Sequence, residues 1–375
     1  MTSFRLFGRS LFALLVLVLL ANVAQGQPAE KPPQPPAKPA QPPEKPTQPP
    51  EKPAQPAAGE YRILKTFEVG GEGGWDYLTV DAEGRRLFVS HATKVVVLDA
   101  DSGKILGEIA DTPGVHGIAL APDLNRGFIS SGRGNAVTIF DLKSLKAIGT
   151  VPTGENPDAI VYEPTTKRVF AMNGRSKDAT VIDAAEGKAA GRIDLGGKPE
   201  FAVVDGAGKL FVNLEDKSEI LQLDPKELKV VARWPLAPGE EPSGLAIDVK
   251  NHRLFSTCGN KMMVVVDSES GKVLATPAIG ENVDGAAFDP ATGLAFSSNG
   301  EGTLTIVHEE NPTTFKVIQT VKTQRGARTI ALDPKTHNVF LPTAEFGPTS
   351  APTKEAPRPR PAVVPGSFRI LVVGK

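Results

Sequence analysis

The chain has 375 residues, a formal net charge of −1 and a pI near 6.6. This balance excludes a protein that binds nucleic acid or an anionic membrane through a large basic surface. Its single cysteine, Cys258, excludes an intramolecular disulfide and a zinc site built from several thiolates.

Residues 1–26 have the pattern of a secretory signal peptide. Arg5 and Arg9 accompany an apolar run that is short for a membrane-spanning helix, and the small residues Ala24 and Gly26 suit cleavage. We therefore expect an exported protein, periplasmic or extracellular, with no transmembrane segment in the mature chain. An uncleaved membrane anchor is the less favoured alternative.

Residues 27–59 repeat Pro, Gln, Glu, Lys and Ala without an apolar face. Such a segment cannot bury enough surface to offset the entropy of ordering, so we expect a disordered Pro-rich spacer. A ligand for a proline-binding partner is the alternative, which the alternation of Lys and Glu does not favour.

From residue 60 to residue 375 one outline occurs seven times. Short apolar or alternating runs are separated by turns rich in Gly, Asn and Asp, as expected for antiparallel strands. A phenylalanine closes the second run of each repeat, at Phe88, Phe128, Phe170, Phe211, Phe255, Phe296 and Phe340. The spacing of 40 to 44 residues matches the length of a propeller blade. We predict an all-β fold, a seven-bladed β-propeller of four-stranded antiparallel blades.

The two ends of this region complement each other. The last repeat stops after its third strand, "FRILVVG", whereas the region begins with an extra strand, "YRILKTFEV". We expect the N-terminal strand to complete the last blade, because this pairing removes an open sheet edge and closes the ring without a disulfide.

The repeats resemble those of the YVTN/YncE-like β-propeller family. The segment "VTIFDLKSLKAIGTVPTGENPDAIVYEPTTKRVFAMN" follows that family's outline, and the tetrapeptide that names the family occurs in altered form, for example as "FVSH", "FAMN" and "FSSN". The likeness covers residues 61–375 and implies a propeller without a fixed set of catalytic residues. Relatives in that family have been associated with DNA, but the nearly neutral charge here argues against nucleic acid as a partner. A WD40 propeller is less favoured, since the single Trp-Asp pair starts a first strand instead of ending a third.

One position repeats just before the first strand of every blade. In a propeller these positions form a ring around the mouth of the central channel. They are Asp76, His116, Asp158, Glu200, Ser243, Asp284 and Arg328. We predict that this ring binds a ligand, because ionisable groups are concentrated at equivalent positions. The alternative is that these residues are polar only because the channel mouth is exposed to water, without binding a specific ligand.

The same face offers several kinds of chemistry. The carboxylates of Asp76, Asp158, Glu200 and Asp284 could collect a divalent cation such as calcium. His116, or His91 from a neighbouring loop, could act as an acid or base, since the unperturbed pKa of histidine is close to neutrality. Arg133, Arg175 and Arg328 could hold an anionic group through paired hydrogen bonds.

The last blade carries a Pro-rich connection, residues 346–366, that is much longer than its counterparts and should lie on the same face. It is interpreted either as a lid or partner contact or as a disordered insertion.

Two functions remain open. The first is an exported binding or scaffold protein, monomeric and without a cofactor, that presents the channel mouth to a ligand or protein partner. The second is a metal-dependent hydrolase or lyase of the lactonase or streptogramin-lyase type that uses the carboxylate and histidine ring. Nucleotide-binding, c-type haem and serine-hydrolase motifs do not occur in the sequence. We favour the binding protein, and the presence of a metal in the ring would decide between the two.

Overall fold

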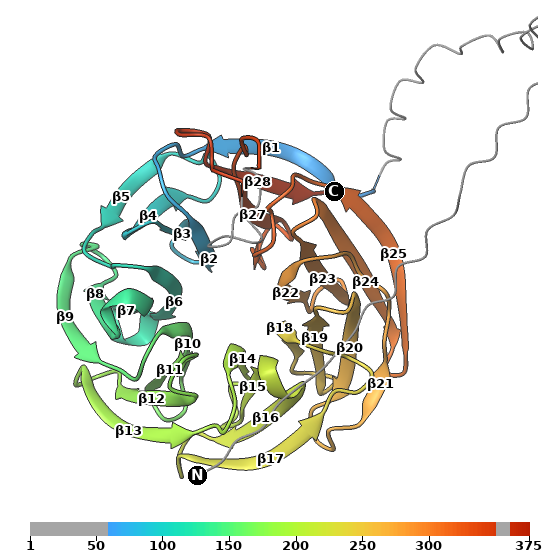
Figure 1. Cartoon of the computed structure of the whole chain (residues 1–375), viewed down its shortest axis with the longest axis horizontal. Helices are drawn as coiled ribbons and strands as arrows, with labels where there is room; N and C mark the ends of the chain where they lie inside the picture. The colour runs from blue at the N-terminus through green and yellow to red at the C-terminus, as the bar shows by residue number, and fades with distance from the viewer. Residues whose placement is uncertain (1–58, 350–360) are drawn as a thin grey trace, which may run out of the picture. The chain divides into compact units, whose positions relative to one another are not determined.

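Seven four-stranded antiparallel sheets stand side by side around a common axis (Figure 1). This is the predicted seven-bladed β-propeller. The computed structural model describes residues 59–349 and 361–375, which belong to one unit spanning Gln55–Lys375. The expected signal peptide and all but the last residue of the expected Pro-rich spacer lie outside the described residues.

Each blade has an innermost strand a, followed outward by strands b, c and d. Strands a are β2 (Trp75–Asp81), β6 (Val115–Ala121), β10 (Pro157–Glu163), β14 (Pro199–Val204), β18 (Pro242–Asp248), β22 (Val283–Asp289) and β26 (Ala331–Leu332). Strands b are β3 (Arg86–His91), β7 (Arg126–Ser131), β11 (Arg168–Asn173), β15 (Leu210–Leu214), β19 (Arg253–Cys258), β23 (Leu294–Asn299) and β27 (Val339–Thr343). Strands c are β4 (Lys94–Asp99), β8 (Ala136–Asp141), β12 (Asp178–Asp183), β16 (Glu219–Asp224), β20 (Met262–Asp267), β24 (Thr303–Asn311) and β28 (Arg369–Gly374). Strands d are β5 (Ile105–Ile109), β9 (Ala147–Pro152), β13 (Lys188–Asp194), β17 (Lys229–Pro235), β21 (Val273–Ala275), β25 (Thr314–Lys322) and β1 (Arg62–Glu68).

Short 3-10 helices occur in three connections, η1 (Pro122–Leu124), η2 (Gly132–Gly134) and η3 (Glu215–Lys217). Within residues 59–349 and 361–375, no helix has the length and apolar character needed to cross a membrane.

The hydrophobic core lies between the blades. The phenylalanine expected to close strand b lies inside the strand, which continues beyond it in every blade, and it is buried in all seven. Phe88 of blade 1, for example, contacts Phe140 of blade 2 with ring centroids 5.8 Å apart. Each such ring contributes roughly 1.5–3 kcal/mol by leaving water. A blade therefore depends on its two neighbours for burial of its sheet faces.

Blade 7 is built from both ends of the described chain. Its strand order is β1-β28-β27-β26, and β1 pairs antiparallel with β28. Phe67 lies opposite Ile370 in this pair and is buried. The predicted closure by the N-terminal strand is confirmed, and in blade 7 it supplies the outer strand that every other blade takes from its own repeat.

Candidate functional site at the channel mouth

The ring residues of the first six blades occupy the second position of strand a. In all six strands the register with strand b is irregular immediately after the first residue. Such bulges re-aim side chains next to functional sites. Serines of strand b fix the backbone here, because Ser90 Oγ accepts the amide of Asp76 at 2.9 Å and Ser130 Oγ accepts that of Gly117 at 2.8 Å.

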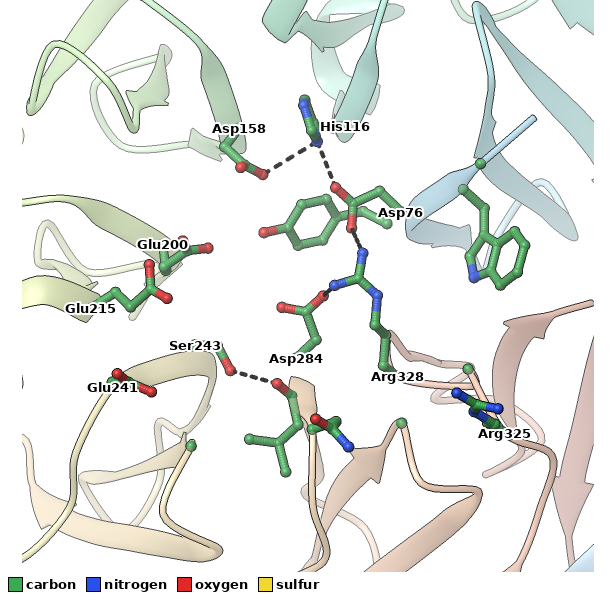
Figure 2. Close-up of a pocket in the computed structure, with 18 of the residues that line it drawn as sticks. Asp76, His116, Asp158, Glu200, Glu215, Glu241, Ser243, Asp284, Arg325 and Arg328 are labelled. Carbon is green, nitrogen blue, oxygen red and sulfur yellow. Dashed lines mark hydrogen bonds and ion pairs between the residues drawn. The ribbon is translucent and has the colours of Figure 1, made fainter. Parts of the chain in front are cut away.

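All seven ring residues line one cavity of about 950 Å³ (Figure 2). The structure thus brings together Asp76, His116, Asp158, Glu200, Ser243, Asp284 and Arg328, as the repeat predicts. It adds lining residues that the ring did not include, among them Tyr77, Lys198, Glu215, Glu241 and Arg325. Lys198 and Arg325 lie in the connections just before ring positions. This location in the sequence could have identified them as further residues of the channel mouth.

Five side chains of the cavity form a continuous polar chain (Figure 2). His116 Nδ1 lies 2.6 Å from Asp76 Oδ2 and 3.7 Å from Asp158 Oδ1. Arg328 lies 2.6 Å from Asp284 and 3.8 Å from the second oxygen of Asp76. These side chains come from blades 3, 2, 1, 7 and 6, so the contact between Arg328 and Asp76 exists only when the ring is closed.

A second group of charges lies beside this chain. Lys198 lies 2.5 Å from Glu200 and also forms an ion pair with Glu215. Ser243 donates its hydroxyl to the carbonyl of Val283, 3.2 Å away. The lysine therefore neutralises part of the acidic wall and the serine has no basic side chain to activate it.

The carboxylates lie deeper than the basic groups. The side chains of Asp76, Asp158, Glu200 and Asp284 are 13–20% exposed. Those of His116, Lys198 and Arg328 are 27–42% exposed. The interior of the cavity is consequently acidic, whereas its positive charges lie closer to solvent.

This arrangement raises the pKa of three carboxyls. Burial, followed by the charge of Asp76, raises the pKa of Asp158 to about 6. Burial and then the charge of Asp158 raise the pKa of Glu200 to about 8. Burial raises the pKa of Asp284 to about 7, although Arg328 opposes the shift. An added positive charge would therefore stabilise the ionised carboxylates.

His116 shows the opposite balance. Burial lowers the pKa of its imidazole, but the hydrogen bond to Asp76 and the charge of Asp158 outweigh burial and raise the pKa to about 9. With this pKa, His116 is an imidazolium held between two carboxylates at neutral pH, so it is poorly suited to act as a base there.

An aromatic pair lies below the carboxylates. The rings of Tyr77 in blade 1 and Phe201 in blade 4 lie 5.3 Å apart across the axis. Tyr77 lines both the large cavity and a small one of about 50 Å³ that Phe201 also lines. The Tyr77 ring therefore separates the two cavities, and the large one has a floor.

Three predicted residues do not reach the cavity. His91 ends β3, is 2% exposed and stacks on Phe368 with ring centroids 4.3 Å apart. Arg133 and Arg175 are exposed in their loops and are not among the lining residues. The expected group of three arginines for an anion is therefore not assembled, because Arg328 alone of the three lines the cavity and it is paired with Asp284.

The long connection of blade 7 reaches the rim of the cavity with its described ends. Phe346, Pro361 and Val363 line the cavity, and Phe346 forms a β-bridge with Val363. Trp75 lies 6.0 Å from Phe346, ring centroid to ring centroid. One wall of the mouth is therefore apolar, while residues 350–360 of the connection lie outside the described residues.

Comparisons with known proteins identify the fold. No protein-family model matches the chain, and no curated protein matches it. Among solved structures, one titled "Kuenenia stuttgartiensis Hydrazine Synthase" is similar with a TM-score of 0.64 and 16% identity, over 71% of this chain and 91% of that one. A structure titled "Structure of U3-55K" is similar with a TM-score of 0.67 and 12% identity, over 84% of this chain and 99% of that one. At these identities the likeness shows the propeller fold alone, so the YVTN/YncE-like resemblance continues to rest on the repeats.

Proposed function

We propose that the protein is an exported binding propeller, a member of the YVTN/YncE-like group, whose channel mouth recognises a positively charged group of a ligand or partner. The observation that carries the proposal is the acidic interior of the mouth cavity. Six carboxylates line it against four basic side chains, and four of the carboxylates, Asp76, Asp158, Glu200 and Asp284, are less exposed than His116, Lys198 and Arg328. A cation that enters would be attracted by charges whose mutual repulsion it relieves.

The rest of the cavity is consistent with binding. Its floor is closed by Tyr77, and one wall carries Trp75, Phe346 and Val363. A pocket with an apolar wall and a few convergent charges is typical of sites for small organic ligands or single side chains. The propeller scaffold itself supports a binding role in general, since loops from seven rigid blades meet at one face.

A metal-dependent hydrolase or lyase is the second candidate. It is favoured by one observation, the position of His116 between the carboxylates of Asp76 and Asp158. Of the two histidines expected to act as an acid or base in such an enzyme, His91 does not line the cavity.

Isothermal titration calorimetry tests the proposed function with three ligands of equal length. We expect 1,6-diaminohexane to bind more tightly than 1,6-hexanediol or adipate, with an affinity that falls as salt screens the charges. Combining Glu200→Gln with Asp284→Asn should weaken diamine binding at least tenfold. Glu108→Gln, on the exposed edge of β5, is the matched control and should leave it unchanged. Equal binding of the diol, or full diamine binding by the double variant, would overturn the proposal.

A further inference from the structure

Three donor groups of the cavity converge on one point. Among the described residues, Asp76, His116 and Asp158 offer ligand atoms that all lie within 4.8 Å of one another. They occupy the same position in the strands a of three consecutive blades. The group is a mixed set of one nitrogen and two carboxylate oxygens, and it opens on a cavity large enough for further ligands.

The separations of these atoms suit a small ion. Bonds of 2.0–2.2 Å from zinc to nitrogen and oxygen place the ligand atoms of one tetrahedral ion roughly 3.3–3.6 Å apart. The distances from His116 Nδ1 to the two carboxylates are 2.6 Å and 3.7 Å, on either side of that range. Shifts of these side chains by less than about 1 Å would bring both distances into this range.

The imidazole is held so that Nδ1 faces the carboxylates. The opposite edge of the ring packs on Gly132, where a Cβ atom would lie 2.7 Å from Nε2. A glycine at this position therefore leaves room for the ring, and any larger residue would displace it.

Neighbouring groups fix the two flanking ligands. Ser130 Oγ accepts the amide of Gly117, which follows His116, and donates to the carbonyl of Asp158, so one hydroxyl joins the two ligand strands. Thr329 donates its hydroxyl to the backbone carbonyl of Asp76 at 2.6 Å. Such outer contacts orient metal ligands and contribute to affinity.

We propose that Asp76, His116 and Asp158 form a binding site for a divalent first-row transition metal ion, with His116 Nδ1 and one oxygen of each carboxylate as ligands. The inference rests on the proposed function, because it identifies the cation that the acidic cavity takes. Positions of the ion not filled by the protein face the cavity, where water or a ligand completes the coordination. Calcium is disfavoured, since it takes six to eight oxygen ligands at longer distances and seldom nitrogen.

Cobalt titration of the chelator-dialysed full chain tests this site. We expect one equivalent of Co²⁺ to bind and to give visible d–d bands, with zinc competing and calcium not competing. His116→Gln and Asp158→Asn should each weaken Co²⁺ binding at least tenfold while the thermal unfolding transition remains. His337→Ala is the matched control, because His337 contacts Asp289 at 2.9 Å in a pair without a third donor.

Each outcome separates this inference from the proposed function. The metal site is overturned if no saturable cobalt band forms, if the band survives in both variants, or if calcium displaces cobalt. If the diamine still binds in that case, the cationic pocket stands without a metal. If cobalt binds and both variants abolish it while the diamine fails to bind, the site is confirmed and the recognised cation is the metal ion itself.

Discussion

The propeller uses carboxylates at both ends of its blades, but it satisfies them in different ways. At the turn end, Asp99 accepts hydrogen bonds from the amide and hydroxyl of Ser102, two or three residues along its own turn, and these bonds lower its pKa. At the mouth, Asp158 and Asp284 face side chains from other blades, and burial raises their pKa.

The difference separates structural from functional carboxylates. A turn carboxylate has its partners within a few residues, so it is satisfied as soon as the turn forms. Asp158 and Asp284 at the mouth instead have their partners on neighbouring blades, so they are paired only when those blades pack together. The same residue type at a repeated position thus stabilises the turns at one face and, at the other, lines the cavity proposed to take a cation.

The largest expected loss of stability comes from replacing a carboxylate of a turn, Asp333. Asp333 is fully buried, lies 2.8 Å from Arg85, and accepts the amide of Lys335 at 3.0 Å. Asp333→Ala should lower the free energy of unfolding by about 3 kcal/mol, because the buried guanidinium edge and turn amide lose their partner. Urea denaturation measures the change. Asp101→Ala, which removes an exposed partner of the same arginine, should cost less than about 1 kcal/mol. Equal losses in the two variants would contradict the comparison.

A smaller change in the free energy of unfolding is expected from replacing Glu309. This carboxylate lies away from the channel mouth and accepts no hydrogen bond from a turn in the part of the chain that the structure describes. Its oxygens are buried without a hydrogen-bond partner among the described residues. Burial, followed by the charge of Asp248, raises its pKa to about 7. Since the folded state then holds the proton more tightly than the unfolded state, stability should fall as pH rises from about 4.5 to about 7.

Glu309→Gln should remove this pH dependence, worth on the order of 2 kcal/mol. Unfolding free energies of both proteins at several pH values measure the difference. Glu310→Gln, on the exposed neighbouring position, is the control and should retain the wild-type slope. A constant difference between wild type and Glu309→Gln over this range would show that the carboxyl does not titrate as proposed.

The smallest effect on stability is expected at the mouth. Glu200→Gln removes a carboxylate whose charge is disfavoured by burial and by Asp158, while Lys198 retains Glu215 as a partner. At pH 7 the free energy of unfolding should stay within about 1 kcal/mol of wild type or rise. Chemical denaturation beside the binding assay checks this. A loss as large as that of Asp333→Ala would mean that the mouth carboxylates stabilise the ring like those of the turns.

The repeat made the ring predictable from the sequence. One equivalent position in each blade had to lie at one end of strand a, and all seven residues line the cavity. Which ring residues pair with one another was not predictable from the sequence. The ion pair of Arg328 with Asp284, for example, depends on the direction of the Asp284 side chain at a bulge.

The loops followed no such rule. His91 was expected on the open face, but it continues the β3–β4 ladder opposite Lys94 and packs on Phe368, a residue from the far end of the chain. Arg133 lies in η2 and is not among the residues that line the cavity. Loop conformation and contacts distant in sequence therefore limit what repeat spacing can predict.

The pairing of β1 with β28 sets an order of events during translation. Blades 1 to 6 each find all four strands within one short stretch of chain, so they can form as that stretch leaves the ribosome. Blade 7 cannot, since Phe67 meets Ile370 only when the segment Arg369–Gly374 has been made. A ribosome that stalls before Arg369 holds an open arc whose first strand lacks its neighbour, and synthesis of the segment Arg369–Gly374 allows that arc to become a ring.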